Sequence, residues 1–99
     1  MLRDVAMIIS GDFEWNDAKA ALNLRIHGVS FDEAITVFED IHHCPYGDGR
    51  GNFMVVGFSD TGRLLTVVNA ERGERVRIIS AWRATRAEQD VYRERTYRR

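Results

Sequence analysis

The first regular pattern along the chain is a short alternating segment followed by apolar residues at helical spacing. Residues 13–15 are typical of a strand, and Asn16 is a residue type that caps the start of a helix. Gly28 is a typical helix stop, because glycine adopts the left-handed backbone conformation at little cost. The apolar positions between these two residues are Ala20, Ala21 and Leu24. The pattern predicts a strand and then a helix that ends at Gly28 and turns these apolar side chains to the core.

Two further helices are predicted by capping boxes, in which a serine or threonine precedes a glutamate by three residues. Ser30 and Glu33 open a helix that continues through Phe38. Thr85 and Glu88 open a C-terminal helix that is mostly polar. Its apolar positions are Ala87, Val91 and Tyr92. With so few apolar residues, we expect this last helix to dock weakly.

Between the second and the last helix, the spacing of apolar residues changes from helical to alternating. The predicted strands cover residues 41–46, 52–59, 63–69 and 75–81. The glycine-bearing connections at residues 47–51, 60–62 and 72–74 favour successive hairpins. We therefore predict an α+β fold with two N-terminal helices, a four-stranded antiparallel meander plus a short N-terminal strand, and a C-terminal helix. Residues 1–12 are interpreted as an N-terminal extension and residues 13–99 as a single domain.

Length and composition place the chain among small folded domains of the cytoplasm. With 99 residues, 44% hydrophobic and 29% charged, it has room for one core. Cys44 is the only cysteine, so no disulfide can form within the chain and a reducing compartment is expected. The apolar run at residues 5–9 is too short for a signal-peptide core or a membrane span, so neither secretion nor a membrane partner is expected.

The charge distribution is uneven although the formal net charge is only -1. Residues 12–48 carry eight acidic and two basic side chains, whereas residues 71–99 carry nine basic and five acidic ones. Nearly all the basic residues are arginine, whose planar guanidinium binds phosphate through two parallel hydrogen bonds. The basic half favours a polyanionic partner. The alternative is a solvated surface on which the charges pair with one another.

Several motifs occur in the order found in one known family. They are residues 15–19 (WNDAK), 23–34 (NLRIHGVSFDEA), 62–65 (GRLL), 71–73 (ERG) and 77–85 (RIISAWRAT). In these motifs the chain resembles the BrnT toxins of type II toxin–antitoxin systems, over nearly all of residues 13–92. The resemblance implies a RelE-like fold and a metal-independent endoribonuclease that inhibits translation without a cofactor. It also implies an RNA substrate and a BrnA-like ribbon-helix-helix antitoxin, through which alone operator DNA is bound.

An alternative function comes from positions at which the chain departs from the family pattern. Ile26, Asn69 and Trp82 stand where the family usually has a lysine, an aromatic residue or histidine, and a basic residue respectively. The departures at Ile26 and Trp82 motivate a catalytically silent module that binds RNA or the antitoxin and acts in transcriptional autoregulation. Cleavage of RNA distinguishes this alternative from the enzyme.

Candidate catalytic residues follow from what metal-free RNA cleavage requires. The ribose 2′-hydroxyl must lose a proton, the phosphorane needs positive charge, and the departing 5′-oxygen needs a proton. In the predicted strand at residues 75–81, alternation gives one face Arg75, Arg77 and Ile79, joined by Arg83 if the strand continues. Trp82 would share the opposite, core-facing side with Ile78. We predict that Arg77 and Arg83 are catalytic and that Arg75 binds substrate.

His27 and Lys19 are predicted to lie on one side of the first helix. The negative end of that helix favours a protonated imidazole at His27, which suits a general acid, although a histidine that caps the helix is an equal alternative. Lys19 precedes His27 by eight residues and is a candidate substrate contact. A salt bridge from Lys19 to Glu14 or Asp17 is equally compatible with the sequence.

The remaining candidates are single residues with weaker support. Glu71, before the arginine-rich strand, is predicted as a catalytic base or as a neutralising charge, and Arg63 as a substrate contact or a solubilising residue. Residues 42–44 (HHC) suggest a metal site, but neighbours in an extended segment point to opposite faces, so no metal is expected. Tyr92 and Tyr97 are expected to anchor the last helix, with base stacking as the alternative.

Overall fold

The computed structural model describes residues 6–47 and 53–97, and of Tyr97 it describes the backbone only. Its strands are β1 (Met7–Ser10), β2 (Phe13–Asn16), β3 (Cys44–Gly47), β4 (Phe53–Phe58), β5 (Leu64–Arg72) and β6 (Arg75–Arg83). Its helices are α1 (Asp17–His27), α2 (Phe31–Ala34), the 3-10 helix η1 (Ile35–Glu39) and α3 (Arg86–Tyr97). Most of the predicted connection at residues 47–51 lies outside the described residues.

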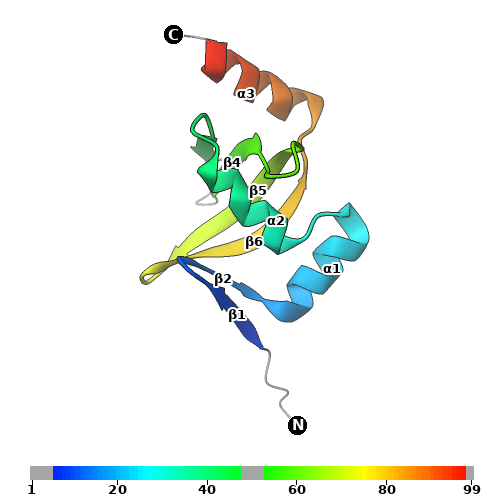
Figure 1. Ribbon diagram of the computed structural model, residues 1–99, viewed down its shortest axis with the longest axis vertical. Helices are drawn as coiled ribbons and strands as arrows, with labels where there is room; N and C mark the ends of the chain where they lie inside the picture. The colour runs from blue at the N-terminus through cyan, green and yellow to red at the C-terminus, as the bar shows by residue number, and fades with distance from the viewer. Residues whose placement is uncertain (1–5, 48–52, 98–99) are drawn as a thin grey trace.

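All six strands form one sheet, in the order β1-β2-β6-β5-β4-β3 (Figure 1). The predicted antiparallel meander is confirmed for β3 to β6. The predicted strand count is wrong, because β1 adds an edge strand where none was predicted and β2 joins the sheet beside β6. The β2–β6 pairing is parallel, with Phe13 opposite Val76 and Glu14 opposite Arg77, so the sheet is mixed.

The helix caps largely match the capping residues in the sequence. The Asn16 side chain accepts the backbone N–H of Lys19, and Ser30 accepts that of Glu33. The box at Thr85 is complete, since its hydroxyl accepts the N–H of Glu88 and the Glu88 carboxylate accepts the N–H of Thr85. Because α2 is a single turn, the predicted second helix continues to Glu39 only as the 3-10 helix η1.

The strand predicted at residues 41–46 begins later than the alternation indicated. Asp40 accepts the backbone N–H of His42 on its side chain and that of His43 on its carbonyl, which bends residues 40–43 into a turn. β3 therefore starts at Cys44. In contrast, β5 and β6 are longer than predicted, at nine residues each.

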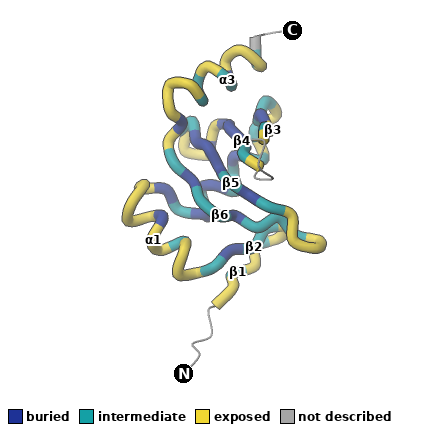
Figure 2. The backbone as a smooth tube through the Cα atoms, turned by 180° about the vertical axis from the view of Figure 1, so that it is seen from behind, coloured by how far each residue is buried: buried dark blue, intermediate teal, exposed yellow. Residues whose placement is uncertain are grey.

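The two faces of the sheet are covered unequally. α1 and α2 enclose the main core on one face, where the largest fully buried side chains include Phe31, Leu65 and Ile78. On the opposite face, α3 covers only the end near β3 and β4, over a small cluster that contains Val56 and Tyr92. Seen from behind in Figure 2, no described helix crosses the middle of β5 and β6. We call this uncovered side of β2, β6 and β5 the open face.

The rotation of α1 is set by a buried asparagine and not by an apolar stripe. Asn23 is the buried residue of α1, and its Nδ2 donates to the carbonyls of Ala81 (2.8 Å) and Val29 (3.0 Å). Its Oδ1 accepts the N–H of Ala81 (3.1 Å) and the hydroxyl of Ser80 (2.9 Å). The side chain thus pairs with the edge of β6 as a neighbouring strand would. The predicted apolar face is wrong in part, because Leu24 is 51% exposed.

We predict that Asn23→Ala destabilises the fold by about 2–4 kcal/mol. The substitution leaves buried backbone groups at the edge of β6 without partners, and each such group costs about 1–3 kcal/mol. Urea unfolding followed by tryptophan fluorescence measures the change. Leu24→Ala is the matched control and should alter stability by less than about 1 kcal/mol, because its side chain is half exposed. Equal effects of the two substitutions would contradict the role given to Asn23.

A bulge in β6 reverses the alternation on which the predicted arginine row depended. Val68 lies opposite Ser80, but Asn69 lies opposite Ile78, so Ile79 is an extra residue in β6. Ile78 and Ala81 consequently both face the main core.

Two predicted side-chain directions are corrected by this shift. Arg83 lies opposite the core residue Leu65 and shares its face, so it does not join Arg75 and Arg77. Trp82 lies opposite Thr66 and faces away from the main core, contrary to the prediction that it shares a face with Ile78. The expected row of three arginines is therefore wrong.

Candidate functional site

Arg77 is held on the open face by an acidic partner from another strand. Its Nε donates to Glu14 Oε2 at 2.7 Å, and its Nη2 donates to the same oxygen. The parallel register of β2 and β6 places these residues side by side, on the face opposite the neighbouring core residues Phe13 and Val76. The Glu14 side chain is 13% exposed and that of Arg77 is 36% exposed, so the pair is only partly screened by water.

The pair leaves polar atoms free for a further contact. Among the described residues, neither Glu14 Oε1 nor Arg77 Nη1 has a hydrogen-bond partner. Arg75 lies two residues before Arg77 on the same face and is half-buried. A phosphate at this position would meet two guanidinium groups and, beside them, a carboxylate able to accept a proton.

His27 and Trp82 meet further along β6. Their ring centroids are 5.9 Å apart, and the rings are inclined by 50°. The Trp82 Nε1–H donates to Glu88 Oε1 at 3.1 Å, and that oxygen also accepts the Thr66 hydroxyl at 2.8 Å. The first turn of α3 therefore holds the Trp82 indole in place, and the His27 imidazole packs against that indole. Because the N–H of Gly28 caps α1 by donating to Leu24, the described geometry does not require a capping role for His27.

A groove lies between α1 and β6, and His27 is one of the residues that line it. It has a volume of about 250 Å³. Its walls are Lys19, Leu22, Asn23, Ile26, His27, Ile79 and Ser80. Lys19 and His27, which were expected on one side of α1, both line this groove. Glu14, one of the two alternative partners considered for Lys19, is paired with Arg77 instead.

The other predicted site residues are not brought to the open face. Glu71 is exposed and lies opposite Val76, a residue that packs on the main core, so it faces away from Arg77. Arg83 is exposed on the core side of the sheet, as described above. The carboxylate on the same face as Arg77 is Glu14, which the sequence indicated only as a possible partner of Lys19. No local pattern could have identified it, because Glu14 and Arg77 are 63 positions apart in the sequence.

Arg63 belongs to a network that joins α1, α2 and the β4–β5 turn. Its Nε and Nη2 donate to the two carboxylate oxygens of Glu33 at 3.0 and 2.5 Å, and Nη2 also reaches the carbonyl of Gly28 at 3.1 Å. The hydroxyls of Ser59 and Thr61 donate to Glu33 as well. The Glu33 carboxylate thus pairs with Arg63 and does not complete the predicted capping box. The described contacts account for Arg63 without a substrate.

The Glu33 network should make stability depend on pH. Hydrogen bonds from Arg63, and further ones from Thr61 and Ser59, lower the pKa of Glu33 to about 2 in spite of its partial burial. A carboxylate whose pKa is lowered by folding stabilises the protein above its unfolded pKa, and the contribution is lost as the pH falls from about 4.5 towards 2. We predict that Glu33→Gln costs about 2 kcal/mol at pH 7 and much less at pH 2.5. Urea titrations at the two pH values test this, and a cost that does not change with pH would contradict it.

Tyr92 anchors α3, in agreement with the expected structural role. Its hydroxyl donates to Asp40 Oδ2 at 2.7 Å, and the same oxygen accepts the N–H of Phe58 at 2.8 Å. Burial, together with the Asp40 hydrogen bond, raises the pKa of Tyr92 to about 12, so the hydroxyl remains a donor at neutral pH. The side chain of Tyr97 lies outside the described part of the structure.

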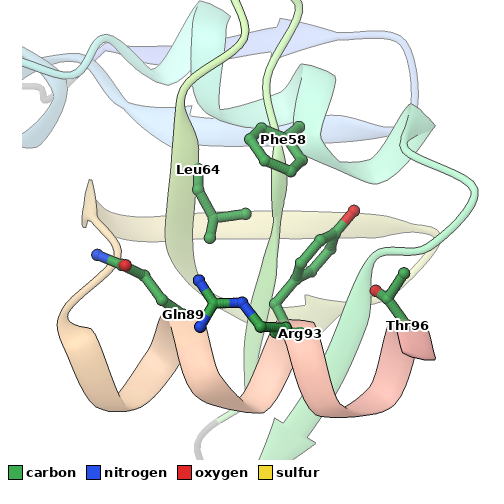
Figure 3. A pocket seen from close by; sticks show the side chains of 6 residues that line it. Phe58, Leu64, Gln89, Arg93 and Thr96 are labelled. Carbon is green, nitrogen blue, oxygen red and sulfur yellow. The ribbon is translucent and has the colours of Figure 1, made fainter. Parts of the chain in front are cut away.

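A second pocket, of about 210 Å³, opens beside this anchor between α3 and the ends of β4 and β5 (Figure 3). It is lined by Phe58, Leu64, Gln89, Tyr92, Arg93 and Thr96. Its aromatic walls, Phe58 and Tyr92, pack edge to face with ring centroids 5.4 Å apart. On the exposed side of α3, Asp90 forms ion pairs with Arg86 and Arg93, so part of the basic C-terminal charge is used within the helix.

Residues 42–44 do not form a ligand cluster. Cys44 is a buried free thiol, while His43 Nδ1 lies 2.8 Å from the Asp40 carbonyl. Within residues 6–47 and 53–97, no group of three or more histidine, cysteine or acidic side chains is placed to hold a metal ion. No helix in the described segments has both the length and the apolar character needed to span a membrane.

The structure is that of a small α+β protein with basic side chains on one uncovered sheet face. A family model described as the ribonuclease toxin BrnT of type II toxin–antitoxin systems matches residues 15–88. The chain therefore belongs to the BrnT toxin family, as the motifs predicted. It is also similar to the crystal structure of the Brucella abortus ribonuclease toxin BrnT, with a TM-score of 0.60 and 17% identity over 73% of this chain and 94% of that chain. At this identity the likeness shows the fold alone. No curated protein matches the sequence significantly.

Proposed function

We propose that this toxin is a metal-independent endoribonuclease that inhibits translation in the cytoplasm and binds RNA across the open face. The observation that carries the proposal is the Arg77–Glu14 pair beside Arg75, in a chain whose family is described as ribonuclease toxins. Its partner is a BrnA-like ribbon-helix-helix antitoxin, and the toxin contacts operator DNA only through that protein. Nothing in residues 6–47 and 53–97 favours the catalytically silent alternative.

The Arg77–Glu14 pair supplies two of the three requirements of metal-free cleavage. Glu14 Oε1 accepts the proton of the ribose 2′-hydroxyl, and the 2′-oxygen then attacks the adjacent phosphorus. Arg77 and Arg75 stabilise the added negative charge of the phosphorane. The 5′-oxygen leaves and takes a proton from solvent, so the products are a 2′,3′-cyclic phosphate and a 5′-hydroxyl end. Glu14 replaces Glu71 as the proposed base, because only Glu14 shares the face of Arg77.

Lys19 and His27 are proposed to bind the RNA beyond the reacting phosphate. Trp82, which contacts His27, follows Arg77 by five residues, a separation of roughly 13–16 Å along β6. Because of this separation, we propose that His27 contacts a neighbouring part of the substrate, in place of its predicted role as general acid. Neither Arg63 nor Arg83 acts on the substrate in this proposal. Arg63 is paired with Glu33, and Arg83 lies on the face of the sheet opposite the open face.

Growth of bacteria that express the toxin tests the function in cells. The unsubstituted chain should arrest growth and leave messenger RNA fragments with cyclic phosphate ends. Arg77→Ala should relieve the arrest, whereas Arg83→Ala, a matched arginine on the other face, should retain it. Growth arrest by Arg77→Ala at equal expression would contradict the proposal.

A further inference from the structure

Trp82 is a half-buried aromatic side chain on the open face. It lies opposite Thr66 of β5, on the side of the sheet away from the main core. Among the described residues it belongs to neither hydrophobic cluster, the one under α1 and α2 or the one under α3. A large aromatic ring that neither core uses, and that keeps contact with water, is typical of a binding surface.

The orientation of the Trp82 indole is fixed before any ligand binds. Glu88 Oε1 accepts the Trp82 Nε1–H at 3.1 Å, the Thr66 hydroxyl at 2.8 Å and the Thr85 backbone N–H at 2.8 Å. One carboxylate oxygen thus ties the ring to β5 and to the start of α3. The only polar atom of the indole is therefore satisfied, so the ring offers a ligand its π-face, and little side-chain freedom is lost on binding.

The surface of the open face is low between Trp82 and Arg77. The side chains that β5 and β6 place there are Ser80, Val68 and Ala70, all of them half-buried. None of these side chains is larger than valine, and no described helix crosses this region (Figure 2). A strand of RNA with one phosphate at Arg77 therefore has a clear path along the sheet towards Trp82.

The groups at the two ends of this path match the two repeating parts of single-stranded RNA. Arg75 and Arg77 suit a phosphate, and Trp82, with the exposed His27 ring 5.9 Å away, suits a base. The path between Arg77 and Trp82 spans roughly 13–16 Å along β6. One nucleotide is shorter than this distance, so a base at Trp82 belongs to a neighbour of the nucleotide held at Arg77.

We propose that Trp82 stacks one nucleobase of the RNA substrate, near but not at the cleaved bond, and so gives the toxin a base preference. This inference rests on the proposed function, which puts the reacting phosphate at Arg77. Every base has a π-face, but a purine has the larger one, so Trp82 favours a purine at this position. His27, beside the indole, contacts the sugar or phosphate of the same nucleotide.

The test uses Trp82→Leu, which removes the ring and retains an apolar side chain. Phe53→Leu is the matched control, because Phe53 is an exposed aromatic residue on the opposite side of the sheet, the side of its β4 neighbour Val55. Trp82→Phe keeps a smaller aromatic face and should give an intermediate result. Similar thermal unfolding midpoints check that all the variants fold.

The first measurement is the affinity for short 2′-O-methyl homo-oligomers, namely oligoadenylate, oligouridylate and a sugar-phosphate oligomer without bases. These oligomers have no free 2′-hydroxyl, so they cannot be cleaved by the proposed route, and their uniform sequence makes the register of binding irrelevant. For the unsubstituted toxin, Trp82→Leu should raise the Kd for oligoadenylate by about tenfold and that for oligouridylate by less. The Kd for the oligomer without bases should change by less than about twofold, and Phe53→Leu should alter none of the three.

The second measurement is tryptophan fluorescence, which identifies the ring directly. The chain has two tryptophans, and Trp15 is only 3% exposed in the main core. Oligoadenylate should therefore quench the emission of Trp82, and no quenching should remain in Trp82→Phe.

The outcomes separate this inference from the proposed enzyme. An unchanged Kd for oligoadenylate in Trp82→Leu, or binding without quenching in the unsubstituted toxin, would overturn the stacking site. Because neither measurement requires cleavage, a toxin that binds bases at Trp82 but leaves ordinary RNA intact would refute only the enzyme. Absence of binding to all three oligomers would contradict both.

Discussion

Arg77→Ala is expected to lower the rate of RNA cleavage by about 100- to 1,000-fold. Removal of one group that stabilises developing charge in a transition state typically has an effect of this size. Arg77 is the arginine that the structure fixes beside a carboxylate on the open face, so its charge is already in place before substrate binds. Single-turnover cleavage of an oligoribonucleotide, followed by gel electrophoresis, measures the rate.

Arg83→Ala is the matched control for this experiment. Both arginines lie on β6 and differ mainly in the face to which they point, because the bulge at Ile79 separates them. Arg83→Ala should change the rate by less than about threefold, as expected of an exposed charge away from the reacting phosphate. A larger loss in Arg83→Ala than in Arg77→Ala would place the reaction on the other side of the sheet.

Glu14→Gln is expected to lower kcat by at least about 100-fold with little effect on KM. General base catalysis contributes about 100- to 10,000-fold, and an amide cannot accept the proton of the 2′-hydroxyl. The glutamine oxygen can still accept a hydrogen bond from Arg77, so the arginine and its contact with phosphate should be retained.

The comparison of Glu14→Gln with Glu14→Ala separates the two roles of Glu14. If Glu14 served only to position Arg77, Glu14→Gln, which keeps that hydrogen bond, would retain most of kcat, and Glu14→Ala would lose it. Steady-state kinetics of both variants on the same oligoribonucleotide make this comparison. Full kcat in Glu14→Gln would exclude Glu14 as the base.

The parts of the fold that depend on contacts between residues close in the chain could be predicted from the sequence. Asn16, Ser30 and Thr85 begin helices because their side chains satisfy backbone N–H groups within three residues. The hairpins of the β3–β6 meander likewise join neighbouring segments through short glycine-bearing turns. In both cases the decisive contact lies close in the chain.

The remaining features depend on contacts between distant segments. The parallel pairing of Glu14 with Arg77 joins strands that are far apart in sequence, and nothing in residues 13–16 marks their partner. Similarly, α1 was expected to bury Leu24, but Asn23 gains four hydrogen bonds by facing β6 and determines the rotation of the helix.

Among the features that the sequence did not predict, the bulge in β6 changed the candidate site most. Strict alternation through residues 75–83 placed Arg83 with Arg77, and a single extra residue at Ile79 separates them. The family motifs identified the strand correctly but did not show which side chains share a face. Of the residues predicted to act on substrate, Arg75, Arg77, Lys19 and His27 lie along the open face or its groove.

The most direct test of the proposed function is cleavage of RNA by the purified toxin in the presence of EDTA, on naked RNA and on RNA in translating ribosomes. With the reaction on the open face, we predict cleavage that leaves 2′,3′-cyclic phosphate ends, that Arg77→Ala slows by about 100- to 1,000-fold and that Arg83→Ala preserves. Intact RNA on both substrates, or cleavage that Arg77→Ala leaves unchanged, would contradict an endoribonuclease at this face.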